Sequence, residues 1–460
     1  MINLEIDKKS ETSLFMQIFE QISNKIINGI LRDGAKLPSQ RELSKQLGVS
    51  VNTVVNAYNM LLQYEYIFSV NRSGYYVNGV KSEKSFFEVY WRRDIPYTYN
   101  FSRNGTDLTM SESIKREIRQ AARELTDRGF HYPDYIGSYE LRKQICLMLG
   151  KYYNIDCLPT QIIIGSNVNY LIDSLIKIIG TNKVYGIENP SHYRLSDFLR
   201  LSGYKSTYLN VGLEGITKKE LEGFGGDVLI TMPYHQYPIG NVMTEEQKRA
   251  VLRWAGNERY VVEWGYDMEF SSSPGSRPMF SMTENKNVIF INDFTRTVAP
   301  DINMAYIVLP EPLVRRWQEG YRSFHSYSSE FEQIFITEML KSESFYKNVK
   351  RLRKAYRAKE NCLISAVKKH PLGERINIIN KGAGTFLLIQ PKIPCDEDVL
   401  LNECHKAGVK ISCVKNSLKQ PNPLIPPRTY ILGFGALSES EIEEGIKLLL
   451  DTWSKIKNYK

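Results

Sequence analysis

The sequence has no long uninterrupted apolar run, which argues against a membrane-spanning segment. The apolar stretch from Tyr170 to Gly180, for example, is broken by Asp173 and Lys177. The chain begins MINLEIDKK, without the basic and then apolar segments of a secretory signal. We therefore expect a cytoplasmic protein without membrane contact.

Cysteine and histidine are both scarce, with six of each among 460 residues. The cysteines form no C-x-x-C pair and the histidines have no metal-site spacing, so we expect no metal site. Scattered cysteines in a large cytosolic chain are most simply reduced thiols.

Apolar residues make up 42% and charged residues 24% of the chain, a globular composition that suits two or three domains at this length. The net charge is +9. Residues 1–80 hold eight basic and seven acidic side chains, so they contribute only +1 and the remainder of the chain contributes +8. The charge favours a polyanionic partner, but affinity in the N-terminal segment must depend on where its cations lie.

The N-terminal segment has the pattern of three short helices. Apolar residues recur at helical spacing from about Ser13 to Ile30. The string LPSQRELSKQLGVSVNTVVNAYNMLLQYEY then predicts two helices joined by a tight turn at Gly48. Ser39 and Glu42 have capping-box spacing for the first of these, and Ser50 caps the second. This is the pattern of a helix-turn-helix, whose second helix enters the major groove.

Polar residues near the start of that second helix, Asn52 and Thr53, are expected on its outer face. The segment Ile67–Val77 alternates enough to predict a hairpin, with Arg72 and Gly74 at its tip. A basic hairpin tip there would act as a wing on phosphate or the minor groove. A small helical domain that binds another protein is the alternative.

Residues 10–78 also resemble the GntR family of winged-helix regulators, in the strings LPSQREL, LGVS, NTVVNAYNML and NRSGYYV. The resemblance implies a double-stranded DNA operator as partner. Val51 stands where the family usually has a basic residue, so we expect one phosphate contact to be missing and operator affinity to be lower. The predicted DNA-binding residues are Ser39, Arg41, Ser50, Asn52, Thr53, Arg72 and Gly74.

Residues 81–99 mix charged and aromatic side chains without a stable period, which predicts a linker, with an extra helix as the alternative. Beyond them, short apolar runs such as QIIIGS, DVLITMPYH and NVIFINDF alternate with helical stretches. This alternation predicts an α/β fold with a mainly parallel sheet, whose ligands bind at the carboxyl ends of strands. The expected domains are a winged helix at 1–80, a large domain at 100–340 and a small C-terminal subdomain at 341–460.

The strand ends resemble a fold-type-I aminotransferase, and with the N-terminal domain the whole chain resembles the MocR-like subgroup of GntR regulators. The matching strings include MPYHQYPIGNVM, VVEWGYDMEF and INDFTRTVAPDINMAYIVLP. The resemblance implies a large mixed, mainly parallel sheet, a small α+β subdomain and a homodimer. It also implies a cleft that holds pyridoxal phosphate in the enzymes.

Three positions that the resemblance assigns to pyridoxal phosphate carry other residues. Arg296 falls at the lysine that forms the internal aldimine, and a guanidinium stays protonated and is a poor nucleophile. Trp264 falls at the aspartate that keeps the pyridine nitrogen protonated, and Asn303 at the arginine that pairs with phosphate. Asp293, close by, would repel a phosphate. We therefore expect no covalently bound cofactor and no transaminase activity.

The replacements allow more than one interpretation. Arg296 either forms an internal ion pair with Asp293 or Asp301 or grips an anionic effector. Trp264 either packs in a closed pocket or stacks on an aromatic or cationic ligand, and His235 is more often structural than a base. The predicted effector cleft comprises Ser166, Asn167, His192, His235, Tyr237, Trp264, Tyr266, Thr295, Arg296 and Asn303.

The sequence therefore predicts a DNA-binding transcription regulator whose aminotransferase-like domain senses a small-molecule effector and forms the homodimer. One alternative is the same regulator with noncovalently bound pyridoxal phosphate. Another is a pyridoxal phosphate-dependent aminotransferase that carries an incidental N-terminal domain. A further one is a structural dimer module that senses nothing, with its cleft filled by Arg296 and Trp264.

Overall fold

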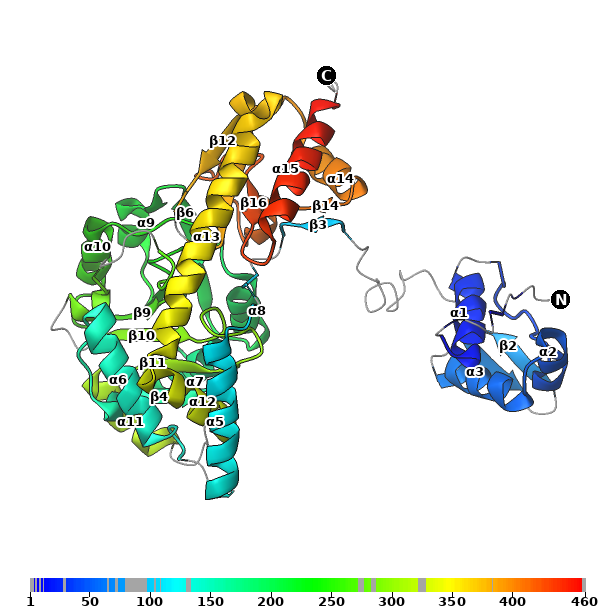
Figure 1. Cartoon of the computed structure of the whole chain (residues 1–460), viewed down its shortest axis with the longest axis horizontal. Helices are drawn as coiled ribbons and strands as arrows, with labels where there is room; N and C mark the ends of the chain where they lie inside the picture. Colours follow the sequence, from blue (N-terminus) through cyan, green and yellow to red (C-terminus); the bar gives the residue numbers. More distant parts are fainter. Residues whose placement is uncertain are drawn as a thin grey trace. The chain divides into compact units, whose positions relative to one another are not determined.

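In the computed structural model the chain divides into two compact units, Met1–Pro96 and Tyr97–Lys460 (Figure 1). The structure describes residues 4, 6–7, 10, 12–27, 30–63, 66–70, 73–78, 97–102, 105–107, 109–129, 134–271, 277–282, 287–321, 328–382 and 384–456. No helix in these ranges is both long enough and apolar enough to cross a membrane.

The N-terminal unit contains three helices followed by a hairpin. The helices are α1 (Leu14–Ile27), α2 (Gln40–Leu47) and α3 (Val51–Gln63), and the strands are β1 (Ile67–Val70) and β2 (Gly74–Val77). The two strands pair antiparallel. The helix-turn-helix and the hairpin predicted from the sequence are therefore both present.

The caps of α2 show why these residues form a separate helix. The Ser39 side chain accepts a hydrogen bond from the backbone N of Glu42, whose carboxylate accepts one from the backbone N of Ser39 at 2.8 Å. Gly48 ends the helix with a φ of 61°, in the left-handed region that glycine adopts at little cost. Both caps agree with the sequence prediction.

The C-terminal unit is built on an eight-stranded sheet with the order β4, β11, β10, β9, β8, β5, β6, β7. The neighbours from β10 through β9, β8 and β5 to β6 pair parallel, and the others pair antiparallel. The mainly parallel α/β sheet is thus confirmed. The strands are β4 (Ile162–Gly165), β5 (Tyr185–Asn189), β6 (Ser206–Gly212), β7 (Gly215–Ile216), β8 (Val228–Thr231), β9 (Tyr260–Trp264), β10 (Val288–Asp293) and β11 (Ala305–Val308).

Helices cover both faces of this sheet, because successive strand residues point to opposite sides. Ile289 packs in a core with α7 and α11, whereas its neighbour Phe290 packs in a core with α6 and α12. The helices of this part are α5 (Glu112–Arg128), α6 (Tyr139–Tyr153), α7 (Val168–Ile179), α8 (Tyr193–Leu201), α9 (Lys218–Gly223), α10 (Glu245–Ala255), α11 (Glu311–Tyr321) and α12 (Glu330–Lys341), with short 3-10 helices at Pro159–Gln161 and Met279–Ser281.

The rest of the unit forms a smaller α+β subdomain, which the long helix α13 (Ser344–Lys369) joins to the large part (Figure 1). Its antiparallel sheet has the order β12, β13, β16, β15, and a short parallel pair joins β14 to β3. The elements are β3 (Tyr99–Asn100), β12 (Ile376–Ile379), β13 (Phe386–Pro391), β14 (Val409–Lys410), β15 (Ser412–Cys413), β16 (Tyr430–Gly433), α14 (Glu397–Lys406) and α15 (Glu439–Ser454), with 3-10 helices at Pro371–Arg375 and Val414–Ser417.

The predicted linker, 81–99, lies outside the described residues as far as position 96. Its last residue, Tyr99, already pairs with Val409 of β14, and Phe101 is buried in the core of the small subdomain. These contacts place the segment with the small subdomain rather than with the large domain expected to begin at 100. We therefore propose Tyr97 as the start of the C-terminal unit.

Candidate functional site

The outer face of the helix-turn-helix carries the polar residues expected there. Asn52 is exposed near the start of α3, and Arg41 is exposed in the first turn of α2. The Ser50 hydroxyl accepts a hydrogen bond from the backbone N of Thr53 and lies 2.8 Å from the Thr53 hydroxyl. Exposed polar side chains at the start of a second helix can reach base edges. Arg72, predicted at the wing, lies outside the described residues.

The hairpin is attached to the helix-turn-helix through Tyr75. Its ring packs edge-on against Tyr58 of α3 with centroids 5.0 Å apart, and its hydroxyl accepts a hydrogen bond from Gln40 at 3.0 Å. The Tyr58 hydroxyl donates to the backbone O of Pro38 just before α2. Gly74 opens β2 with a φ of 118°, which other residues rarely adopt. These contacts hold the helices and the wing in one fixed arrangement.

The carboxyl ends of β4, β5, β8, β9 and β10 share one edge of the large sheet, because these strands run in the same direction. The predicted cleft residues Ser166 and Asn167 follow β4 at this edge. The Asn167 side chain accepts a hydrogen bond from the backbone N of Tyr170, so it caps α7. This contact shows a structural role for Asn167.

Four aromatic side chains gather at this edge. His192 lies with its ring centroid 5.2 Å from Tyr237, 5.6 Å from Trp264 and 5.8 Å from Tyr266. Trp264 and Tyr266 are 5.6 Å apart at nearly right angles. Rings at these distances pack directly against one another. We call His192, Tyr237, Trp264 and Tyr266 the aromatic cluster.

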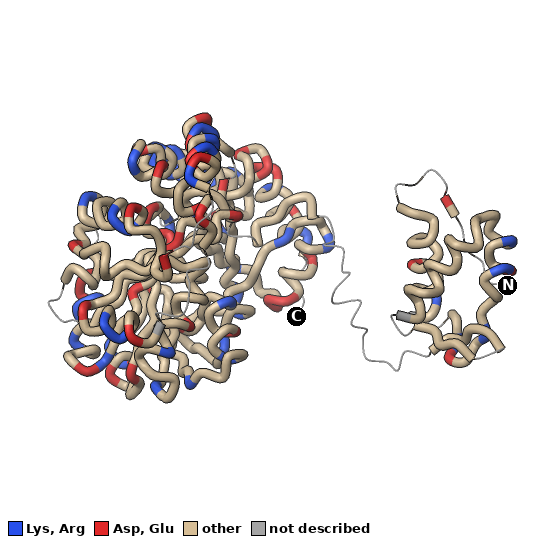
Figure 2. Tube along the Cα trace, turned by 90° about the horizontal axis from the view of Figure 1, so that it is seen from below, with Lys and Arg blue, Asp and Glu red and all other residues tan. Residues whose placement is uncertain are grey.

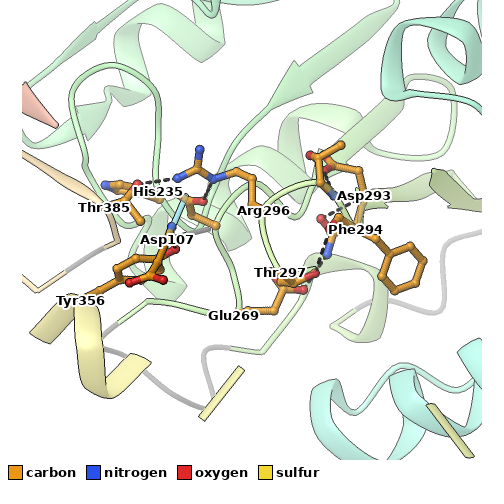
Figure 3. Close-up of polar contacts among 12 residues, drawn as sticks. Asp107, His235, Glu269, Asp293, Phe294, Arg296, Thr297, Tyr356 and Thr385 are labelled. Atoms are coloured by element: carbon orange, nitrogen blue, oxygen red, sulfur yellow. Dashed lines mark hydrogen bonds and ion pairs between the residues drawn. The ribbon is translucent and has the colours of Figure 1, made fainter. Parts of the chain in front are cut away.

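Arg296 lies beside this cluster and pairs with Asp267. Figure 3 shows the Arg296 side chain directed toward His235 and Thr385. Its Nε donates to one carboxylate oxygen of Asp267, while the other carboxylate oxygen lies 2.8 Å from Nδ1 of His235. A terminal nitrogen of Arg296 donates to the Thr385 hydroxyl, just before β13 of the small subdomain. The guanidinium also lies 5.3 Å from the Tyr266 ring centroid. Arg296 therefore joins the large part of the unit to the small subdomain.

This network is largely shielded from solvent: the Asp267 and His235 side chains are 0% exposed and that of Arg296 is 14% exposed. Burial by itself raises the pKa of Asp267, but Arg296 and His235 lower it by more, so the pKa of this carboxyl group lies below its usual range. Burial lowers the pKa of Arg296, yet the Asp267 charge outweighs this and raises it. Burial, with Arg194 and Arg296 nearby, lowers the pKa of His192 to about 4. His192 is therefore neutral near pH 7.

The ion-pair partner differs from the sequence expectation, which was Asp293 or Asp301. Asp293 instead accepts hydrogen bonds from the backbone N and hydroxyl of Thr295. Asp301 is exposed. Asp267 forms the pair because it is buried beside the guanidinium despite a separation of 29 residues. The sequence did contain a signal, since Asp267 lies within the string VVEWGYDMEF that matches the family.

Asn303 lies apart from the network. It is exposed, and its backbone N donates to the carboxylate of Glu332 at 3.1 Å. The Thr295 hydroxyl donates its hydrogen bond to Asp293, as described above. The predicted cleft residues that the structure brings into mutual contact are His192, His235, Tyr237, Trp264, Tyr266 and Arg296.

Comparison with known proteins identifies both units. Residues 14–77 match the model of the gntR family of bacterial regulatory proteins, and residues 98–415 match aminotransferase class I and II. An archaeal alanine:glyoxylate aminotransferase has a similar fold, with a TM-score of 0.67 and 19% identity over 78% of this chain and 91% of that one. Aspartate aminotransferase from Thermus thermophilus also has a similar fold, with a TM-score of 0.68 and 15% identity over 79% of this chain and 94% of that one.

Several similar proteins span the full length. The HTH-type transcriptional regulator YdeL of Bacillus subtilis is 27% identical over 97% of this chain and 98% of its own. The probable rhizopine catabolism regulatory protein MocR of Rhizobium meliloti is 22% identical over 97% of this chain and 95% of its own length. The pyridoxine biosynthesis regulator PdxR of Corynebacterium glutamicum is 24% identical over 90% of each. The chain therefore belongs to the MocR-like subgroup of GntR-family transcription regulators, in which a helix-turn-helix domain precedes an aminotransferase class I and II domain.

Proposed function

We propose that this regulator uses its aminotransferase-type unit to sense a small-molecule effector and to form a homodimer, and that the unit transfers no amino group. The observation that carries the proposal is the buried pair of Arg296 and Asp267. It occupies the position at which the sequence resemblance places the aldimine lysine. A guanidinium held in such a pair keeps its proton and has no nucleophilic lone pair to offer.

The other residues at this edge do not fit pyridoxal phosphate either. The pyridine nitrogen requires a carboxylate partner, whereas Trp264 presents a ring nitrogen that can only donate a hydrogen bond. That nitrogen is buried and has no hydrogen-bond partner among the described residues. The exposed Asn303 carries no positive charge that could pair with the phosphate. We propose that the cleft accepts a different molecule.

The same contacts suggest how an effector would act. Arg296 reaches across from the large part to Thr385 of the small subdomain, with Tyr266 of the aromatic cluster close by. A ligand at this edge would change these contacts, and with them the relative stability of two arrangements of the unit. In a homodimer, such a shift would select among half-site spacings on DNA.

The test is covalent labelling of the purified full-length protein. Pyridoxal phosphate is added, borohydride is then added to reduce any imine, and the intact mass and the labelled peptide are measured. We expect no stoichiometric label at the cleft. A reducible label on one cleft residue of the wild-type protein would overturn the proposal.

The variant Arg296→Lys is the matched comparison, because it puts an amine at the same backbone position. A label that appears only in this variant, on residue 296, would show that the assay reaches the cleft and that the wild-type residue is what prevents the reaction. Absorbance before reduction distinguishes noncovalent binding of pyridoxal phosphate. Transfer of an amino group by the wild-type protein would also contradict the proposal.

The DNA contact is tested separately with Arg41→Ala. If Arg41 binds a phosphate, the variant should bind all duplexes more weakly, and the salt dependence of binding should flatten by about one unit. Fluorescence anisotropy with a labelled duplex at several KCl concentrations measures both. An unchanged salt dependence would mean that Arg41 does not contact a phosphate.

A further inference from the structure

The excess positive charge of this chain lies outside its DNA-reading unit. Residues 1–80 carry a net charge of only +1. The single helix α13 contains nine lysine and arginine residues against one glutamate, a net charge of +8. Figure 2 shows basic and acidic residues interspersed along the trace of the C-terminal unit. One helix thus carries a charge equal to the whole surplus of the chain beyond residue 80.

Three of these nine cations have structural partners. Lys359 donates to the carboxylate of Asp107 at 2.9 Å, and Arg351 lies 3.6 Å from the same carboxylate. Arg353 donates to the backbone O of Glu269. These contacts attach α13 to the rest of the unit. They leave six cations that the packing of the helix does not require.

All six of these cations are exposed, and none forms an ion pair with any residue in the described ranges. Five of them share one face of the helix. At 100° per residue they fall within an arc of about 80°, and they span about 30 Å along the axis. The opposite face is buried through residues such as Leu352, Tyr356 and Leu363. We call the five the α13 stripe: Lys347, Lys350, Lys354, Arg357 and Lys368.

We propose that the α13 stripe binds the phosphate backbone of duplex DNA. Ordinary surface helices intersperse acidic with basic residues, so that their charges balance. Here the single glutamate, Glu360, instead accepts a hydrogen bond from the backbone N of Gly382. Four of the five cations lie three or four residues apart, and Lys368 follows eleven residues after Arg357 on the same face. A row of unbalanced cations on one face of a helix matches a polyanion with closely spaced charges.

DNA is the polyanion because the same chain carries a helix-turn-helix unit. Duplex DNA bears one negative charge per roughly 1.7 Å of its axis, so a stripe about 30 Å long faces many phosphates. Contacts of this kind carry no sequence information; they add affinity and a steep salt dependence. The proposal therefore goes beyond the operator recognition assigned to α2 and α3.

The test compares three full-length proteins on one labelled 60-base-pair duplex of mixed sequence, by fluorescence anisotropy between 50 and 200 mM KCl. The first is the wild-type protein. The second carries Lys347→Gln, Lys350→Gln, Lys354→Gln and Arg357→Gln, all on the stripe. The control carries Lys219→Gln, Arg253→Gln, Arg315→Gln and Arg316→Gln, which are exposed residues of α9, α10 and α11. The two variants lose the same formal charge.

We expect the stripe variant to bind DNA more weakly than the wild-type protein. The slope of log affinity against log salt concentration should become shallower by up to about four units, because each phosphate that the variant no longer neutralises removes about one unit. The control should keep the wild-type slope. An unchanged slope in the stripe variant, or an equal flattening in both variants, would overturn the proposal. Weaker binding of the stripe variant to polyglutamate, together with unchanged binding to DNA, would also overturn the proposal, since it would indicate an acidic protein partner.

Failure of the winged helix is distinguishable from failure of this proposal. Asn52→Ala removes a side chain at the start of α3 and leaves the stripe intact. In an Asn52→Ala background the four stripe substitutions should still flatten the salt dependence. If they have no effect there, the stripe does not bind DNA independently of α3, and the proposal is wrong.

Discussion

Asp267 is a non-glycine residue with a φ of 55°, and its fully enclosed side chain is held beside a charged guanidinium. Removing one member of a buried ion pair leaves the other member's charge uncompensated, which costs far more than the pair itself contributes. Asp293, close by, differs because burial raises the pKa of its carboxyl group. The two aspartates therefore allow a matched comparison.

We predict that Asp267→Asn lowers the free energy of unfolding by about 3–5 kcal/mol, because Arg296 keeps its charge without a carboxylate partner. Asp293→Asn should cost less than about 1 kcal/mol. Urea unfolding at pH 7 measures both. The lowered pKa of Asp267 means that its contribution is present above the usual carboxyl range and is lost as the pH falls through the lowered value. Equal losses in the two variants would contradict this account.

A second residue-scale prediction concerns Glu188, which is 1% exposed and whose pKa burial raises from 4.5 to about 7. The folded protein holds this proton between those pH values while the unfolded chain releases it, so stability falls as the pH rises from 4.5 to about 7. Glu188→Gln imitates the protonated form. We expect it to reduce the loss of stability across this pH range by about 3 kcal/mol.

Thermal unfolding of both proteins across this pH range measures the effect. The exposed Glu222→Gln is the control, because it makes the same chemical change at the surface. Other buried carboxyl groups contribute equally to wild type and variant, so they cancel in the difference. A Glu188→Gln profile parallel to that of the wild-type protein would show that Glu188 is ionised in the folded state.

At the scale of elements, capping residues show where local sequence is sufficient. Ser39 with Glu42 caps α2, and Ser438 with Glu441 caps α15 in the same reciprocal way. Each cap satisfies backbone N–H groups that a helix start otherwise leaves unpaired. A spacing of three residues is enough to predict the α2 cap, because every atom involved lies within one helical turn.

Ser39→Ala should cost about 1 kcal/mol and lower the melting temperature of the N-terminal unit by roughly 4–8 °C, since that unit is small. Ser438→Ala should cost about as much but shift only the C-terminal unit, and by fewer degrees because that unit is larger. Calorimetry of the full chain distinguishes the two transitions. A single transition that both variants shift equally would show that the units unfold together.

At the scale of the whole molecule, the division of labour follows from the two units. The first presents polar side chains on a helix-turn-helix, and the second carries both the Arg296 network and the α13 stripe. We propose that one reads sequence, while the other senses a ligand and adds phosphate contacts. The net charge of the N-terminal unit gives no hint of this arrangement, because affinity depends on which side chains face the DNA.

The sequence by itself determined the helix-turn-helix, the alternation of strands and helices, and the arginine at position 296. These features are local, since each depends on residues within a few turns or strands of one another. Only the tertiary structure decided that Arg296 pairs with Asp267 rather than with Asp293. Ion pairing depends on distance and burial in space, and the fold places a residue 29 positions away against the guanidinium.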